Sequence, residues 1–241
     1  TAVGRNSLLA NTTGTRNTAV GSLSLDANTT ASYNSAVGYN SLGSNTTGEE
    51  NVAVGDNAML DNTTGDKNTA VGTSSLANNT TASNNTAIGY AALNAATTGG
   101  YNVALGGNAL EAMTTGEYNT ALGMQSMSSL TTASSNTAVG KNSLNATTTG
   151  ASNVAMGHNA LLTNTTASNN VGIGKSALLV NTTGGNNTAV GTSALAANTT
   201  AAGGTAVGLS ALAANTDGTE NVALGAWALQ VIIIRLWVLM P

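Results

Sequence analysis

An unbroken 17-residue repeat is the feature that most constrains the fold of this chain. The motif Asn-Thr-Ala-Val-Gly recurs at a constant interval from Gly4 to Gly225, without one insertion or deletion. Written from the Asn, the unit is N-[TV]-A-[VILM]-G-x-x-[AS]-L-x-x-N-T-T-[GA]-x-x, and its positions are numbered 1 to 17 from that Asn. Self-similarity at such a short period predicts a solenoid in which each repeat forms one coil.

The composition of the unit favours strands over helices. Its two apolar runs are shorter than the eight or more residues of an ordinary helix. In residues 51–55 the side chains of positions 2 and 4 share one face of a strand, and the Ala of position 3 lies on the other face. We expect the larger position 4 to point inward, position 2 to lie at the edge of the core, and the Leu of position 9 to supply the second inward side chain. Each repeat is thus predicted to be a flat, two-layered coil.

One coil buries too little to be stable alone, so the coils are expected to stack in parallel. The predicted fold is all-β: a parallel β-solenoid, or β-roll, of about 14 coils over residues 1–229 and about 62 Å long at roughly 4.8 Å per coil. Stacked Asn amides can hydrogen-bond from coil to coil, and Gly suits the corner after the strand because it accepts a positive φ. The predicted ladders comprise Asn17, Asn34, Asn51 and Asn68; Val20, Val37, Val54 and Val71; Gly21, Gly38, Gly55 and Gly72; and Leu25, Leu42 and Leu76.

Composition and charge argue against catalysis and against nucleic acid as a partner. Only 7% of residues are charged, the net charge is −4, and the Lys and Arg residues are isolated in the sequence, so no basic stripe is expected to bind phosphates. The chain has no Cys and hence no thiolate metal site. Its single His, His158, occupies variable position 6, where we expect a solvent-facing side chain rather than part of a catalytic triad. The sequence therefore predicts a non-enzymatic protein without cofactor, catalytic residues or metal ligands.

The strand motif resembles that of a known family of surface proteins. The Val-Ala-[VL]-Gly copies at residues 52–55, 103–106 and 222–225, each followed by two variable residues and a small one, resemble the YadA-like head repeats of trimeric autotransporter adhesins. The Asn-Thr-Ala-Val-Gly array of this chain also resembles the arrays of phage tail-fibre-like proteins. The resemblance implies left-handed β-rolls that assemble as a homotrimer or filament at the cell surface, outside the cell or on a phage virion. The unit here is longer than that of the head repeats and adds a recurring Asn-Thr-Thr-[Gly/Ala] segment.

Three functions are consistent with these patterns. The leading hypothesis is a structural or adhesive fibre segment of a surface-exposed adhesin, with surface carbohydrate or matrix as a candidate ligand. The first alternative is a phage tail-fibre shaft for host attachment. The second is an ice-binding solenoid that uses the Thr ladders of positions 13 and 14, which run from Thr12 and Thr13 to Thr199 and Thr200. Adjacent residues of a strand point opposite ways, so the Thr pair forms one flat surface only if it lies in a bend.

Two further sets of residues are candidates for contacts with a partner. The small side chains of Ala19, Ala36 and Ala53 would allow a neighbouring subunit to approach closely. Ala96, Met113 and Leu130, followed by Thr147, replace the Asn of position 12 in four consecutive repeats. They form either an apolar contact patch or a set of turn residues that enter the core. The Asn-Thr-Thr triplets match the N-glycosylation acceptor pattern, although their even spacing is better explained by a repeated turn.

The last 12 residues, 230–241, depart from the repeat. This hydrophobic tail is shorter than the about 20 residues of a membrane-spanning helix, so no membrane span is predicted. In the overlapping frame formed by the last base of each codon and the first two of the next, Trp237-Val238 must encode Gly and Met240-Pro241 must encode Ala. Permitted codons for the other residues give Thr-Gly-Tyr-Asn-Asn-Thr-Ala-Val-Gly-Ala-Asn-Ala, the pattern of the repeat itself. We interpret the tail as a frame-shifted repeat, and residues 1–229 as part of a longer array.

Overall fold

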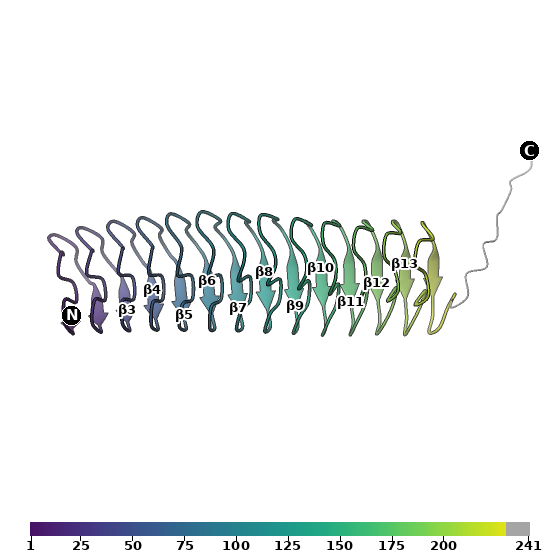
Figure 1. The fold of residues 1–241 in the computed structure, drawn as a ribbon, viewed down its shortest axis with the longest axis horizontal. Helices are drawn as coiled ribbons and strands as arrows, with labels where there is room; N and C mark the ends of the chain where they lie inside the picture. The colour runs from purple at the N-terminus through teal and green to yellow at the C-terminus, as the bar shows by residue number, and fades with distance from the viewer. Residues whose placement is uncertain (230–241) are drawn as a thin grey trace, which may run out of the picture.

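The computed structural model of the protein describes residues 1–229 and confirms the predicted all-β solenoid. A single 14-stranded parallel sheet runs along the molecule, with the strands in sequence order from β1 to β14. Each coil contributes one short strand, and the coils stack into a straight rod (Figure 1). The strands are β1 (Ala2–Val3), β2 (Thr18–Val20), β3 (Ser35–Val37), β4 (Val52–Val54), β5 (Thr69–Val71), β6 (Thr86–Ile88), β7 (Val103–Leu105), β8 (Thr120–Leu122), β9 (Thr137–Val139), β10 (Val154–Met156), β11 (Val171–Ile173), β12 (Thr188–Val190), β13 (Thr205–Val207) and β14 (Val222–Leu224).

The register of the sheet follows the repeat residue by residue. Val20 pairs with Val37, and Val54 pairs with Val71, so equivalent positions of neighbouring coils stack directly. The predicted columns of Val and Leu are therefore present. In this register, equivalent residues of successive coils lie directly above one another. Each position of the repeat therefore forms one column that runs along the rod.

The second apolar run of the repeat does not form a strand, contrary to the prediction of two short strands per coil. Positions 7, 9 and 17 adopt left-handed backbone conformations, as at Leu25 (φ 50°) and Leu110 (φ 53°). A left-handed conformation costs a residue with a side chain about 1–2 kcal/mol. Hydrogen bonds to the next coil hold this backbone in place, for example from the Leu25 amide to the carbonyl of Ser41 at 3.1 Å. The coil conformation therefore depends on its neighbours.

The strand faces the core with its Ala residue, and this corrects the prediction that the Val of position 4 points inward. Ala19, Ala36 and Ala53 are fully buried, whereas Val20 and Val37 are 37% and 40% exposed. The interior of the coil has room for little more than a methyl group here. At Gly172, which replaces this Ala in β11, an added Cβ would lie 3.2 Å from the side chain of Leu161. The larger side chains are consequently on the outer face.

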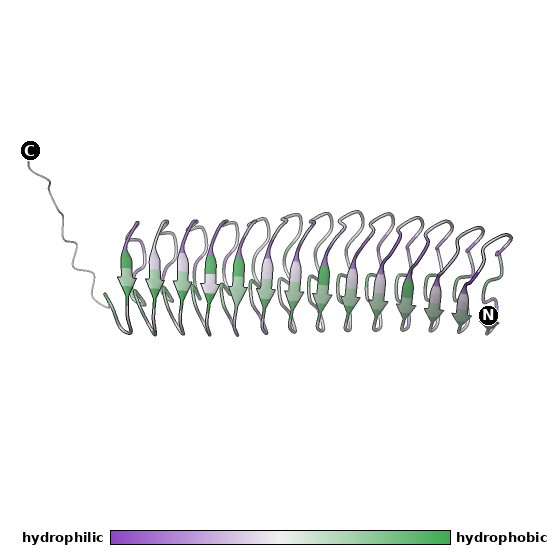
Figure 2. Cartoon of the chain, turned by 180° about the vertical axis from the view of Figure 1, so that it is seen from behind, coloured by the Kyte–Doolittle hydropathy of each residue, from purple (hydrophilic) through white to green (hydrophobic). Residues whose placement is uncertain are grey.

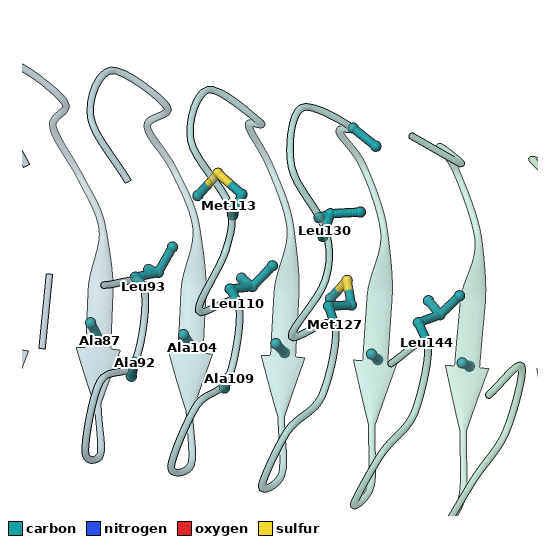
Figure 3. Close-up of a cluster of buried hydrophobic side chains, with 14 of the residues drawn as sticks. Ala87, Ala92, Leu93, Ala104, Ala109, Leu110, Met113, Met127, Leu130 and Leu144 are labelled. Atoms are coloured by element: carbon teal, nitrogen blue, oxygen red, sulfur yellow. The ribbon is translucent and has the colours of Figure 1, made fainter. Parts of the chain in front are cut away.

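Leu and Met side chains of position 9 fill the rest of the core, as predicted for Leu25, Leu42 and Leu76, all of which are fully buried. Figure 3 shows the position 9 side chains of consecutive middle coils, Leu93, Leu110, Met127 and Leu144, with the strand residues Ala87 and Ala104 beside them. In the middle coils Met113 and Leu130 lie above Leu110 and Met127 and extend the core toward the far corner.

The Gly of position 5 turns the chain at the end of each strand. Gly55 has a φ of 140°, and a Cβ added there would lie 2.6 Å from the carbonyl carbon of Gly72. Real Cβ atoms do not approach other atoms so closely, and a side chain at this φ is strained. This corner brings neighbouring coils into direct backbone contact and places position 6 at the surface.

Candidate interaction surfaces

The outer side of the sheet forms a continuous surface, here called the strand face, made of positions 2 and 4 of β2–β14. Every residue of these two columns is Thr, Ser, Val, Ile, Leu or Met, and none is charged. The column at position 4 remains apolar along the whole rod, and several of its members are more than one-third exposed. Figure 2 shows the strands in white and green, and the segments that lead into them in purple. Because the position 4 side chains of the strands are exposed, hydrophobic side chains gather on this outer face.

The Thr hydroxyls divide into two kinds. The hydroxyl of position 13 is used inside the rod: Thr46 Oγ1 donates to the Thr63 carbonyl at 3.0 Å, and Thr63 Oγ1 donates to the Thr80 carbonyl at 2.9 Å. The Thr of position 14, such as Thr47, is exposed. Positions 13 and 14 thus do not offer two columns of free hydroxyls, which the predicted ice-binding surface required.

Asn side chains of position 1 form a buried ladder, as predicted for Asn17, Asn34, Asn51 and Asn68. The amide N–H of Asn51 donates to Oδ1 of Asn34 at 2.9 Å, and its Nδ2 donates to the Gly65 carbonyl at 2.8 Å. The coil-to-coil bond therefore runs from backbone to side chain. The ladder ends at Gly204, whose amide N–H donates to Oδ1 of Asn187 at 2.8 Å.

The Asn of position 12 forms a second internal ladder. Nδ2 of Asn62 donates to Oδ1 of Asn45 at 2.8 Å and to the Gly65 carbonyl at 3.0 Å. Both side chains are fully buried. The folded rod therefore does not present these Asn-Thr-Thr sites to a glycosylating enzyme, and the turn explains the motif.

The two predicted contact sets lie inside the rod. Ala96, Met113 and Leu130 are fully buried core residues, so the hypothesis of an apolar contact patch is wrong and the alternative of turn residues in the core is right. The column of Ala19, Ala36 and Ala53 is likewise internal and cannot face a second subunit. A contact through the sheet must use the strand face instead.

Exposed aromatic side chains lie at the corners on either side of the strand face. All five Tyr residues are exposed, since the interior has no space for a ring. The rings of Tyr101 and Tyr118 stack with centroids 5.2 Å apart. Arg16 lies 5.1 Å above the Tyr33 ring and donates to its hydroxyl at 2.8 Å. The five tyrosines therefore all lie in the first half of the rod.

A basic column occupies the second half of the rod and was missed in the sequence analysis. Lys141, His158 and Lys175 all occupy position 6 of consecutive coils, and all three are exposed, as expected for His158. They are far apart in the sequence, which is why the cations seemed isolated. The spacing of one repeat between each of these residues and the next indicates that they share a column.

Residues 1–229 contain no helix long and apolar enough to cross a membrane and no group of three or more His, Asp or Glu side chains placed to hold a metal ion. The frame-shift interpretation of residues 230–241 concerns a segment outside the described residues. Comparison of the chain with protein-family models, with curated proteins and with solved structures gave no match.

Proposed function

We propose that this chain is a non-enzymatic segment of a structural or adhesive fibre exposed at a cell or virion surface, and that copies of it associate through the strand face. The observation that carries the proposal is the uncharged, largely apolar strand face, which continues over the whole sheet. A column of exposed Val, Ile, Leu and Met is unusual on a soluble monomer and typical of an interaction surface.

The size of the strand face fits a second copy of the chain. A face of this length, about 58 Å at roughly 4.8 Å per coil, and roughly 12 Å wide would bury about 700 Å² per copy, close to the about 800 Å² of a standard interface. Identical columns on each copy are self-complementary, because any two coils present the same side chains. The resemblance to trimeric autotransporter heads favours three rods with their strand faces turned toward a common axis.

The molecular mass of the chain in solution tests the self-association. We expect an oligomer by light scattering, with a trimer as the specific expectation. Replacing Val54 and Leu105 by Lys should dissociate it while leaving the circular dichroism spectrum intact, because like charges facing each other across an interface cost several kcal/mol. In the matched control, Lys replaces Thr64 and Thr115, which are exposed in the same two coils but lie outside the strand face. This control protein should remain oligomeric. A monomeric parent protein would contradict the proposal.

A second candidate function, ice or ordered-water binding, is favoured by one observation on the same face. The Thr residues of position 2, such as Thr69 and Thr86, form no side-chain hydrogen bond within residues 1–229, and they share the column with Val residues and one Ser. Free hydroxyls and methyl groups therefore recur at the coil spacing. Thermal hysteresis of the monomeric parent protein would support this function, and a face buried in an oligomer would exclude it.

A further inference from the structure

Charge is distributed unevenly along the rod. Eight of the ten acidic residues precede Tyr118, namely Asp26, Glu49, Glu50, Asp56, Asp61, Asp66, Glu111 and Glu117; the other two are Asp217 and Glu220. Between Tyr118 and Asp217 there is no acidic residue, and the only basic or imidazole side chains are those of Lys141, His158 and Lys175. The second half of the rod is therefore locally cationic on a chain whose net charge is −4.

The fold gathers these three side chains into one column, here called the basic ladder. The register of β9, β10 and β11 aligns the three coils, and each ladder residue follows the Gly that ends its strand. The amide N–H of Asn159 donates to the Lys141 carbonyl at 3.1 Å, and that of Ser176 donates to the His158 carbonyl at 3.0 Å. The backbone under the ladder is thus held at the coil spacing of about 4.8 Å.

The lysines of the ladder have no carboxylate partner nearby. One full coil without an acidic residue, 119–135, separates Glu117 from the coil that carries Lys141, and another, 187–203, separates Lys175 from Asp217. Unpaired cations held near one another repel, and an anion between them removes that repulsion. We propose that the basic ladder binds an acidic polysaccharide, a chain that carries sulfate or carboxylate groups along its length.

The surroundings of the ladder favour a sugar chain over a nucleic acid. The amides of Asn142 and Asn159 at position 7 stand beside the ladder and can hydrogen-bond to the hydroxyl groups of a sugar. Binding to nucleic acid depends mainly on neutralising many phosphates along the backbone, and two lysines and one histidine supply few such contacts.

This inference rests on the proposed adhesive function, for which it names a ligand, but it does not depend on self-association. The test measures binding of dextran sulfate, polygalacturonate, neutral dextran and oligodeoxythymidylate to the full chain by calorimetry, with the mass of the same samples measured by light scattering. A monomer that binds would uphold the ladder without the strand-face proposal. An oligomer that does not bind would refute the ladder alone.

The decisive variant replaces Lys141 and Lys175 by Gln. We expect binding of an acidic polysaccharide, no binding of neutral dextran, and a loss in the variant on the order of tenfold, comparable to the loss when salt is raised from about 50 mM to about 200 mM. The matched control replaces Arg5 and Lys67 by Gln, which removes the same charge elsewhere, and should bind within about twofold of the parent. Equal binding by the variant, an equal loss in the control, or tighter binding of the oligonucleotide would overturn the proposal.

Discussion

The coils at the two ends of the rod and those in its middle close the same turn in different ways. In the end coils the carbonyl of position 15 accepts two hydrogen bonds: Gly65 accepts from Asn51 at 2.8 Å and from Asn62 at 3.0 Å. In the middle coils, where position 12 is Ala96, Met113, Leu130 or Thr147, the same carbonyl accepts one side-chain bond. Ala133, for example, accepts only from Asn119, at 2.9 Å.

The Asn ladder of position 1 changes with this substitution. Nδ2 of Asn119 also approaches Oδ1 of Asn102 at 3.2 Å, and Nδ2 of Asn136 approaches Oδ1 of Asn119 at 3.3 Å. Such side-chain pairs between position 1 residues follow the coils that lack Asn at position 12. The apolar side chain enlarges the core, and the remaining Asn ladder takes over the polar contacts.

The irregular coils near the end of the rod show that one of the two donors can be lost. Gly204 replaces the Asn of position 1, yet the Gly218 carbonyl still accepts from Asn215 at 2.9 Å. The Nδ2 of Asn170 has no partner among the described residues, and the Gly184 carbonyl still accepts from Asn181 at 2.9 Å. Both irregularities occur where position 12 is Asn. The position 12 Asn is thus the remaining donor to this carbonyl in these two coils, whereas the position 1 Asn is its only side-chain donor in the middle of the rod.

The largest effect is expected from a charge in the apolar column of the middle coils. Replacing Leu130 by Asp should lower the free energy of unfolding by more than about 3 kcal/mol, because an unpaired carboxylate would enter a fully buried site. Urea titration followed by circular dichroism measures the change. Replacing Thr132 of the same coil by Asp should have little effect, since that side chain is exposed. Equal losses at both sites would contradict the buried position of Leu130.

The second comparison replaces the position 1 Asn by Ala in a middle coil and in an end coil. Both Asn119→Ala and Asn51→Ala remove the acceptor of the next coil's amide N–H, Asn136 or Asn68. Only Asn119→Ala also leaves the Ala133 carbonyl without a side-chain donor. A buried polar group without a partner costs about 1–3 kcal/mol, so the middle variant should be less stable by that amount.

A double variant sharpens this comparison. In a Leu130→Asn background the new amide can reach the Ala133 carbonyl, as Asn62 reaches the Gly65 carbonyl in its own coil. The additional cost of Asn119→Ala should then disappear in a double-mutant cycle measured by urea titration. A cycle without coupling would show that the two ladders act independently.

The smallest effect is expected where the two regions meet. Oδ1 of Asn79 has no hydrogen-bond partner among the described residues, because the next coil has Ala96 in place of an Asn. Ala96→Asn would supply the missing donor for Asn79 and a second donor for the Gly99 carbonyl. It should therefore raise the free energy of unfolding by about 1 kcal/mol or less, which would be seen as a small rise in the melting temperature. Ala95→Asn, its neighbour on the outside of the coil, should change nothing. A loss of more than about 2 kcal/mol would show that the ladder cannot be extended.

Much of the architecture follows from the period itself. A constant interval between equivalent residues allows only one register, so the columns of Val20 and Leu25 and the Gly corner at Gly55 could be predicted without coordinates. The conformation of the second apolar run of the repeat, around position 9, could not be predicted from the sequence. Leu110, for example, adopts a left-handed backbone conformation that a Leu residue does not favour. Only the stacked neighbours stabilise that conformation.

The candidate surfaces were less predictable than the fold. The basic ladder follows from residue spacing alone, and was overlooked because Lys141, His158 and Lys175 are isolated along the chain. The side chains of position 4 were expected to point inward because the larger hydrophobic residue of a strand is usually the buried one. The interior of the coil accommodates the Ala of position 3 instead, so the larger side chains lie on the outer face.

The repeat, the parallel stacking, the order of the strands and the Asn ladder of position 1 could all be predicted from the sequence, since each depends only on which residues recur and at what interval. The second Asn ladder, at position 12, could not be distinguished from a turn. The tertiary structure decided which side of each strand is inside. Alternation places Val20 and Ala19 on opposite faces but does not say which faces the core. The narrow interior decides it, because the position 9 side chains, such as Leu161, leave space for a methyl group and not for a Val.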